Sequence, residues 1–241
     1  MSVLKYPLLL ITLLLLFALP VTATTLKLAT LAPEGSDWMT QMRQGAAEIK
    51  ALTEGRVEIK IFGGGVMGNE KNMLRKIRIG QLQGGAFTGG GLAEVYPNLR
   101  LLTLPFLFNT LDEVDRVRAE FDPILMQGLA DQGLVSFGLA EGGFALLMGN
   151  QPLTRIEDLK NQKVWVPEGD RVTAAVMQAL ELSPTSLPIS DVLTGLQTGL
   201  IHIVGVSPIG ALAFQWHTRV KYINETPTNR IGPMRKWPSL P

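Results

Sequence analysis

The side chains that perform most enzyme chemistry are scarce in this sequence. Its 241 residues include no cysteine and only two histidines, His202 and His217. Without a thiol there is no disulfide framework, thiolate metal site, cysteine nucleophile or lipid-modified cysteine. No acidic residue accompanies His202 in a triad-like pattern, so histidine-based catalysis and histidine metal sites are disfavoured.

Three polar residues could still support hydrolysis. Ser207 stands in Gly-Val-Ser-Pro, which lacks the Gly-x-Ser-x-Gly turn that exposes a nucleophilic serine. Glu168 and Asp170 lie two residues apart and could hold a metal through oxygen ligands. Such pairs more commonly cap the helix that follows them. An envelope hydrolase that uses Ser207 or the acidic pair therefore remains a second alternative.

A glycine-rich segment, Gly63–Gly68, has the spacing of a dinucleotide-binding turn between a predicted strand and a predicted helix. The acid that would bind the ribose should follow about 20 residues later. Residues 79–92 contain no Asp or Glu. We therefore expect a tight turn here and predict no cofactor and no metal. Gly84-Gly85 and Gly89–Gly91 form another segment where the backbone can approach a ligand.

Composition and charge indicate a folded protein with no general attraction to nucleic acid. The sequence is 46% apolar and 18% charged, with 22 basic and 21 acidic residues. Removing an N-terminal leader that holds Lys5 and no acid leaves equal numbers of each sign. A chain with no net charge has no overall attraction to nucleic acid.

The first 23 residues are typical of a secretory signal. Lys5 supplies the positive charge, residues 8–19 form an uncharged apolar run, and Val21-Thr22-Ala23 offers small residues for cleavage. The apolar run is shorter than the roughly 20 residues needed to cross a bilayer. We expect cleavage after Ala23 and a periplasmic mature protein.

Strand and helix patterns alternate along the rest of the chain. Val57, Ile59 and Ile61 share one strand face. Helices are predicted to begin at Ser36 or Asp37, at Asn69, at Thr110, at Asp170 and at Ser190. Strands are predicted at 134–139, 144–148, 163–166, 185–187 and 201–206.

This alternation predicts an α/β fold with mostly parallel sheets in two lobes, residues 24–141 and 142–225. Such sheets bind ligands at the carboxyl ends of their strands, where Trp165 is expected. The last segment, 226–241, has four prolines and no apolar period, so it is predicted to be irregular.

Five segments together carry a resemblance to a known family: Leu28–Pro33, Gly68–Glu70, Leu104–Phe108, Leu159–Val164 and Pro208–Gly210. From about Leu26 to Ile223 the sequence resembles the DctP-type solute-binding proteins of TRAP (tripartite ATP-independent periplasmic) transporters. The resemblance implies a two-lobed architecture like that of periplasmic binding proteins, with a ligand cleft between the lobes. It also implies a receptor, not an enzyme, that passes a small molecule to an ion-gradient-driven permease with small and large membrane subunits.

The predicted ligand-binding residues come from both lobes. They are Pro33, Glu34 and Thr88 from the first lobe, and Phe144, Trp165, Glu168, Ser207 and Trp216 from the second.

Three departures from the family pattern bear on the ligand. Many members carry an arginine where this sequence has Trp165, a second arginine where it has Ala145, and an asparagine where it has Ser207. A guanidinium binds a carboxylate through two hydrogen bonds, whereas an indole offers an apolar face and one N–H. We therefore expect a ligand that is less acidic or more apolar than the usual organic acids.

The resemblance ends before the family pattern does. Members return to the first lobe with another strand and a long helix, which residues 228–241 do not match. The sequence is expected to be truncated or frameshifted after about Pro227. An incomplete fragment, non-functional or serving only in interactions, is therefore the first alternative to a working receptor.

Overall fold

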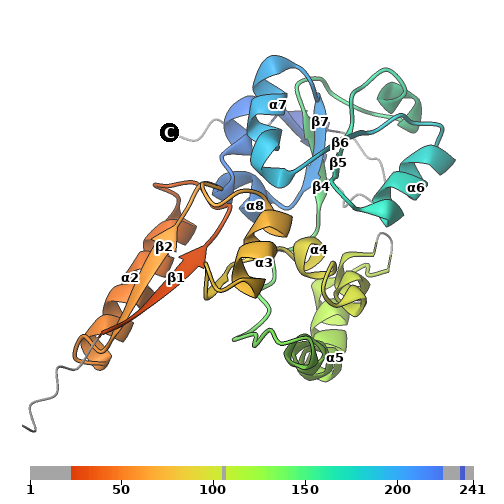
Figure 1. Ribbon diagram of the computed structural model, residues 1–241. Coiled ribbons are helices and arrows are strands. Elements are labelled where there is room, and N and C mark those ends of the chain that lie inside the picture. The colour runs from red at the N-terminus through yellow and green to blue at the C-terminus, as the bar shows by residue number, and fades with distance from the viewer. Residues whose placement is uncertain (1–22, 105–106, 225–233, 237–241) are drawn as a thin grey trace, which may run out of the picture.

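The computed structural model describes residues 23–104, 107–224 and 234–236 (Figure 1). The predicted leader lies outside these ranges except for Ala23. None of the described helices is both long enough and apolar enough to cross a membrane.

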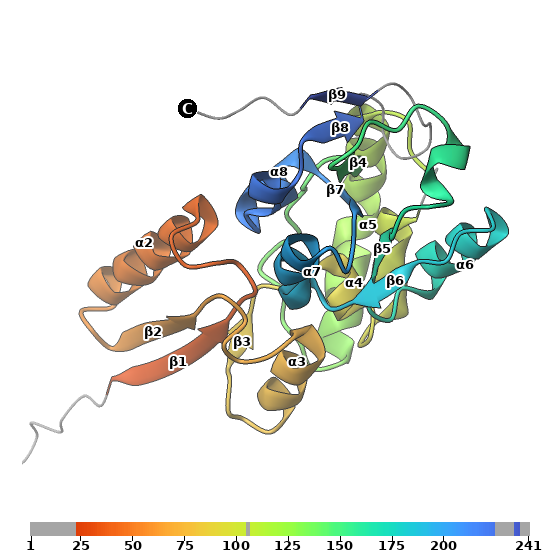
Figure 2. The same cartoon turned by 90° about the horizontal axis from the view of Figure 1, so that it is seen from above.

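A parallel three-stranded sheet organises the first lobe. Its strands are β1 (Thr24–Ala29), β2 (Val57–Phe62) and β3 (Gly84–Gly85), in the order β2-β1-β3. Helix α2 (Asp37–Leu52) connects β1 to β2, and α3 (Glu70–Arg78) connects β2 to β3. Figures 1 and 2 show β1, β2 and α2 as an arm that extends away from the rest of the molecule.

Side-chain caps start the helices where the sequence predicts. Ser36 accepts a hydrogen bond from the N–H of Met39 at the start of α2. Asn69 does the same for α3. Each cap satisfies a backbone donor that the first helical turn leaves free.

The first lobe ends in three helical elements: α4 (Gly89–Leu92), the 3₁₀ segment η1 (Pro97–Thr103) and α5 (Leu111–Asp131). Thr110 caps α5.

The strand predicted at 134–139 is wrong. Leu134 and Leu139 pack against the buried cluster beneath α5, while Val135 and Phe137 are exposed. An apolar run forms a strand only where a partner strand is available, and no described strand pairs with this segment.

The second lobe contains six strands: β4 (Leu146–Gly149), β5 (Trp165–Pro167), β6 (Thr185–Leu187), β7 (Ile203–Val206), β8 (Tyr222–Asn224) and β9 (Met234–Lys236). β5 and β6 are parallel, as expected. The larger sheet, in the order β7-β4-β8-β9, is antiparallel, so the prediction of mostly parallel sheets is wrong there. β9 also falls within the segment predicted to be irregular; the rest of that segment lies outside the described residues.

Short helices connect these strands. They are η2 (Ile156–Leu159), α6 (Arg171–Ala179), η3 (Ile189–Asp191), α7 (Val192–Thr198), α8 (Pro208–Ala213) and η4 (Trp216–Arg219). The predicted helices near Asp170 and Ser190 correspond to α6 and to η3 with α7.

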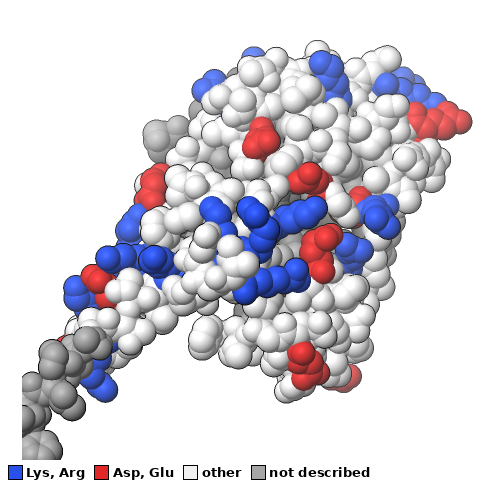
Figure 3. All heavy atoms as spheres, in the orientation of Figure 1, with Lys and Arg blue, Asp and Glu red and all other residues white. Residues whose placement is uncertain are grey.

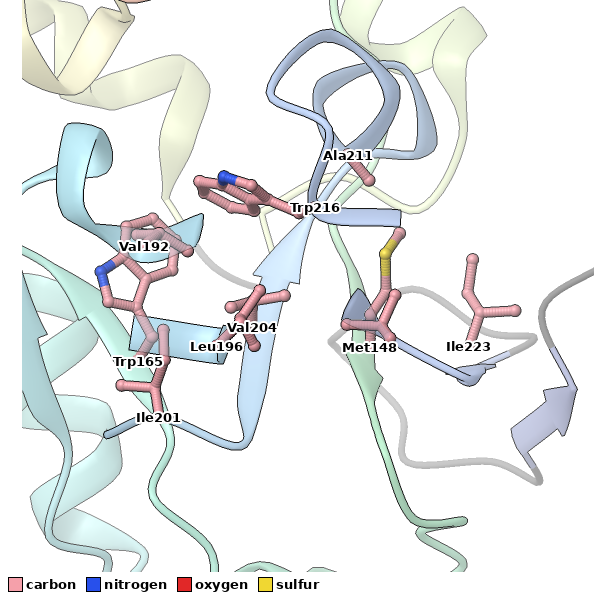
Figure 4. Packing of buried hydrophobic residues seen from close by; sticks show 10 residues of the cluster. Met148, Trp165, Val192, Leu196, Ile201, Val204, Ala211, Trp216 and Ile223 are labelled. Atoms are coloured by element: carbon pink, nitrogen blue, oxygen red, sulfur yellow. The ribbon is translucent and has the colours of Figure 1, made fainter. Parts of the chain in front are cut away.

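Two tryptophans anchor the core of the second lobe. Trp165 and Trp216 are buried with Met148, Val192 and Val204 around β4 and β7 (Figure 4). The two ring centroids lie 5.2 Å apart in an edge-to-face arrangement, which is favourable for aromatic pairs.

Apolar contacts connect the two lobes. The half-buried side chains of Ile189 and Phe214 pack against the second-lobe core and also against the first-lobe cluster of Ala29, Leu31, Met73 and Leu82. The lobes therefore share an apolar contact at the place where their loops meet.

Candidate functional site

Loops that follow the parallel strands of both lobes meet at one junction. A Cβ atom added to Gly65, after β2, would lie 3.7 Å from Cβ of Ser190, after β6. One added to Gly169, after β5, would lie 3.5 Å from Oε1 of Glu94. These are ordinary van der Waals distances. The carboxyl ends of the strands, where α/β sheets bind ligands, therefore face each other across the junction.

Asn69 forms a polar link across this junction. Its Nδ2 donates to Oε2 of Glu168 at 3.3 Å, while its Oδ1 accepts from the N–H of Asn72 at 3.0 Å. One side chain thus caps α3 and reaches the other lobe.

A partly buried carboxylate lies next to Asn69 in the chain. Glu70 accepts the N–H of Thr88 at 2.5 Å and its hydroxyl at 3.0 Å. Thr88 Oγ1 in turn accepts the N–H of Gly91 at 3.0 Å. A Cβ atom on Gly91 would overlap the Glu70 carboxyl, so a larger residue there would displace this carboxylate.

Burial raises the pKa of the Glu70 carboxyl above its ordinary value, and the two hydrogen bonds from Thr88 oppose this increase. The folded protein thus binds the carboxyl proton of Glu70 more tightly than the unfolded chain does. The resulting stabilisation is complete at low pH and is lost as pH rises through the pKa of the folded state.

Glu70→Gln tests this linkage. Glutamine carries no charge and retains an oxygen that accepts from Thr88. We expect the free energy of unfolding of the variant, relative to the parent, to increase between about pH 4 and about pH 7. Urea unfolding of both proteins at several pH values measures this difference in the free energy of unfolding. Glu120→Gln, on the exposed face of α5, removes the same charge and is the control. A flat pH profile for Glu70→Gln would contradict the assignment.

Four predicted ligand-binding residues lie at the junction or beside it. Thr88 and Glu168 take part in the contacts described above. The loop that contains Glu34 approaches Gly63, and Arg43 holds the Glu34 carboxylate at 2.7 Å, which lowers the pKa of Glu34. Pro33 precedes it, and its carbonyl accepts from the Ser36 hydroxyl at 2.8 Å.

Ser207 and Phe144 lie near the connection between the lobes. Ser207 Oγ accepts the N–H of Gly210 at 3.1 Å and thereby caps α8. A Cβ on Gly142 would lie 3.3 Å from the same oxygen, so Ser207 is next to the connecting segment. Phe144 is half-buried. It lies before β4, because this strand begins at Leu146 and not at Phe144 as predicted.

The structure places Trp165 and Trp216 away from the surface. Trp165 begins β5, although the sequence predicts it at the carboxyl end of a strand. It is 5% exposed, and its indole N–H donates to the carbonyl of Leu187 at 3.0 Å. Trp216 is 2% exposed and stacks on Phe214 with centroids 5.4 Å apart. Both indoles therefore pack in the core of the second lobe.

Sequence reasoning omitted three residues from the predicted site. Asn69 and Glu70 belong to a segment that carries the family resemblance, and this signal could have identified them. Phe214 packs against the second-lobe core and also against the first-lobe cluster. Its contact with both lobes has no signature in the sequence, because it depends on how the lobes pack.

The polar residues do not form the machinery of a hydrolase. His217 Nδ1 lies 3.2 Å from the carbonyl oxygen of Ala211, and His202 Nδ1 accepts the N–H of Lys163 at 3.5 Å. Asp170 caps α6 by accepting the N–H of Thr173. Among residues 23–104, 107–224 and 234–236, no group of three or more His, Cys, Asp or Glu could hold a metal.

Two α/β lobes whose strand-end loops face each other form an architecture of the periplasmic-binding-protein class. Residues 28–203 match the sequence profile of DctP, described as bacterial extracellular solute-binding protein, family 7. The chain belongs to this family.

Similar sequences are also named as binding proteins. A solute-binding protein of Roseobacter denitrificans is 29% identical over 179 residues, which cover 73% of this chain and 54% of that protein. The C4-dicarboxylate-binding periplasmic protein DctP of Shewanella loihica is 29% identical over 167 residues, which cover 67% and 49%. The chain thus spans about half the length of these curated relatives.

Solved structures share the fold. A TRAP periplasmic solute-binding protein of Roseobacter denitrificans with bound L-galactonate is 26% identical, with a TM-score of 0.74 over 88% of this chain and 69% of that one. A TRAP protein of Xanthobacter autotrophicus with bound β-D-galacturonate is 24% identical, with a TM-score of 0.75 over 87% and 70%.

Proposed function

We propose that this protein is the extracytoplasmic solute receptor of a TRAP transporter, and that it binds a small molecule between its lobes. The observation that carries this proposal is the meeting of strand-end loops from both lobes around Asn69, Glu70, Thr88 and Glu168. A ligand that contacts both sides stabilises the closed arrangement over the open one.

Its proposed location is the periplasm, and its proposed partners are the small and large membrane subunits of the permease. Family membership and the names of periplasmic relatives support both. A leader cleaved after Ala23 belongs to the same proposal.

The ligand is proposed to be less acidic than the acids bound by the solved relatives. The support is Trp165, which brings no charge to a position where many family members have arginine. Because its N–H is already bonded to Leu187, it also offers no free donor. Its burial removes the expected stacking surface, so a more apolar ligand has less support than a less acidic one.

Thermal unfolding with a small ligand panel tests the proposal. The panel contains L-galactonate, galacturonate and succinate beside neutral galactitol and galactose. At about one hundred times its Kd a ligand adds about 2.7 kcal/mol, which raises Tm by about 5–10 °C for a chain of this size. A neutral compound should give the larger shift. A larger shift with the acids would contradict the proposed ligand class, and no shift with any small molecule would contradict the receptor function.

Replacing Glu168 tests where the ligand binds. Glu168→Ala removes a carboxylate at the junction, and we expect it to abolish at least half of the ligand-induced shift. Glu157→Ala, an exposed position in η2 of the second lobe, should leave the shift unchanged. A full shift in Glu168→Ala would place the ligand elsewhere.

A further inference from the structure

The exposed face of α3 concentrates positive charge. Lys71, Arg75 and Arg78 are exposed and follow one another at intervals of four and three residues, so they form one stripe on the helix. Lys76 extends the stripe at the last turn. Figure 3 shows Lys and Arg gathered over α3 near the centre of this face of the molecule.

These cations have no ion-pair partner among the residues that the structure describes. No described carboxylate forms an ion pair with any of these four cations. Two cations on other helices do have such partners: Arg43 of α2 pairs with Glu34 at 2.7 Å, and Arg118 of α5 pairs with Asp122 at 2.8 Å. The acid within α3, Glu70, is directed to Thr88 instead.

Helix stability alone does not account for the stripe. Cations in the last turn are favoured by the helix dipole, which suits Arg75, Lys76 and Arg78. Lys71 lies in the first turn, where the dipole disfavours a cation. Like charges four residues apart, such as Lys71 and Arg75, also repel each other.

Exposed apolar side chains flank the stripe. Ile79 follows the helix and is 60% exposed; Val66 precedes it and is 71% exposed. Lys76 Nζ donates to the carbonyl of Met67 at 2.9 Å, which ties the loop containing Val66 to the last turn of α3. Cations and exposed apolar side chains thus lie close together near the last turn of α3.

We propose that this surface, made of Val66, Lys71, Arg75, Lys76, Arg78 and Ile79, binds the anionic headgroups of a phospholipid membrane. Basic residues beside exposed apolar side chains are the combination by which peripheral proteins bind such membranes. The projecting side chains of α3 are better suited to a diffuse layer of anionic headgroups than to a protein partner of defined shape. Binding would hold the first lobe against the membrane that contains the permease.

Co-sedimentation of the full chain with vesicles tests this inference. The vesicles contain equal parts of phosphatidylglycerol and phosphatidylcholine, with pure phosphatidylcholine for comparison. We expect binding only to the anionic vesicles and its loss in about 0.5 M NaCl. Each cation near such a surface contributes about 1 kcal/mol, or about fivefold in affinity. Arg75→Gln with Arg78→Gln should therefore weaken binding by about thirtyfold.

A matched pair of variants separates this surface from net charge. Arg116→Gln with Arg219→Gln removes the same charge from α5 and η4 and should leave vesicle binding unchanged. Ile79→Ser should weaken binding severalfold. Equal binding to both kinds of vesicle, equal effects of the two double variants, or binding to polyglutamate but not to vesicles would each overturn the proposal. Far-UV circular dichroism confirms that the variants are folded.

Discussion

Trp216→Ala should lower the free energy of unfolding by about 3–5 kcal/mol. Trp216 is 2% exposed and is the largest side chain among the fully buried residues of the described chain. Its ring contacts both Trp165 and Phe214. Replacing it with alanine leaves a cavity bounded by rings that cannot all move inward. The free energy lost with the buried side chain therefore adds to the free-energy cost of the cavity.

Trp216→Ala should also weaken the contact at the junction between the lobes. Phe214 stacks on Trp216 and packs against the first-lobe cluster, so an unsupported Phe214 weakens the contact between the lobes. Urea unfolding followed by far-UV circular dichroism measures the stability without relying on tryptophan fluorescence. Trp38→Ala, at a position that is 43% exposed in α2, is the control and should cost about 1 kcal/mol or less. Equal costs for the two variants would contradict the packing described for Trp216.

Gly85→Ala should lower the free energy of unfolding by about 2–3 kcal/mol and remove ligand binding. Gly85 pairs with Ala29 where β3 lies beside β1. A Cβ atom at this position would overlap the carbonyl oxygen of Ala29 and lie 3.1 Å from the Phe87 ring. Because the closest obstacle is backbone, the strand itself has to shift. This shift would carry Thr88 away from Glu70.

Gly90→Ala is the matched control for this change. Nothing lies closer to the new Cβ than Thr88 Oγ1 at 3.8 Å, and the residue is within helix α4. Alanine should be tolerated and should stabilise the helix by up to about 1 kcal/mol. Urea unfolding gives the stability of both variants, and ligand-induced thermal shifts give their binding. If Gly85→Ala were as stable as the parent, β3 would not be packed against β1 as described.

Much of the fold can be predicted from local patterns. The caps Ser36, Asn69 and Thr110 mark helix starts because each bonds a backbone N–H three residues away. The alternation of Val57, Ile59 and Ile61 likewise marks β2. These signals are readable because the interacting groups are neighbours in the sequence.

Strand partners could not be predicted in the same way. The larger sheet of the second lobe is antiparallel, and the segment 134–139 forms no strand, although its composition suits one. Whether an apolar run pairs, and in which direction, depends on strands that are distant in the sequence. The prediction that Trp165 ends a strand is wrong for the same reason, since the pairing of β5 with β6 decides where the strand begins.

The sequence thus established the alternation of elements, the helix starts, the family and the absence of thiol chemistry. The tertiary structure alone decided which residues meet between the lobes. The hydrogen bond from Asn69 to Glu168 joins positions 99 residues apart, and Phe214 touches two cores. Such contacts depend on how two folded units pack against each other, and no local periodicity or cap records that arrangement.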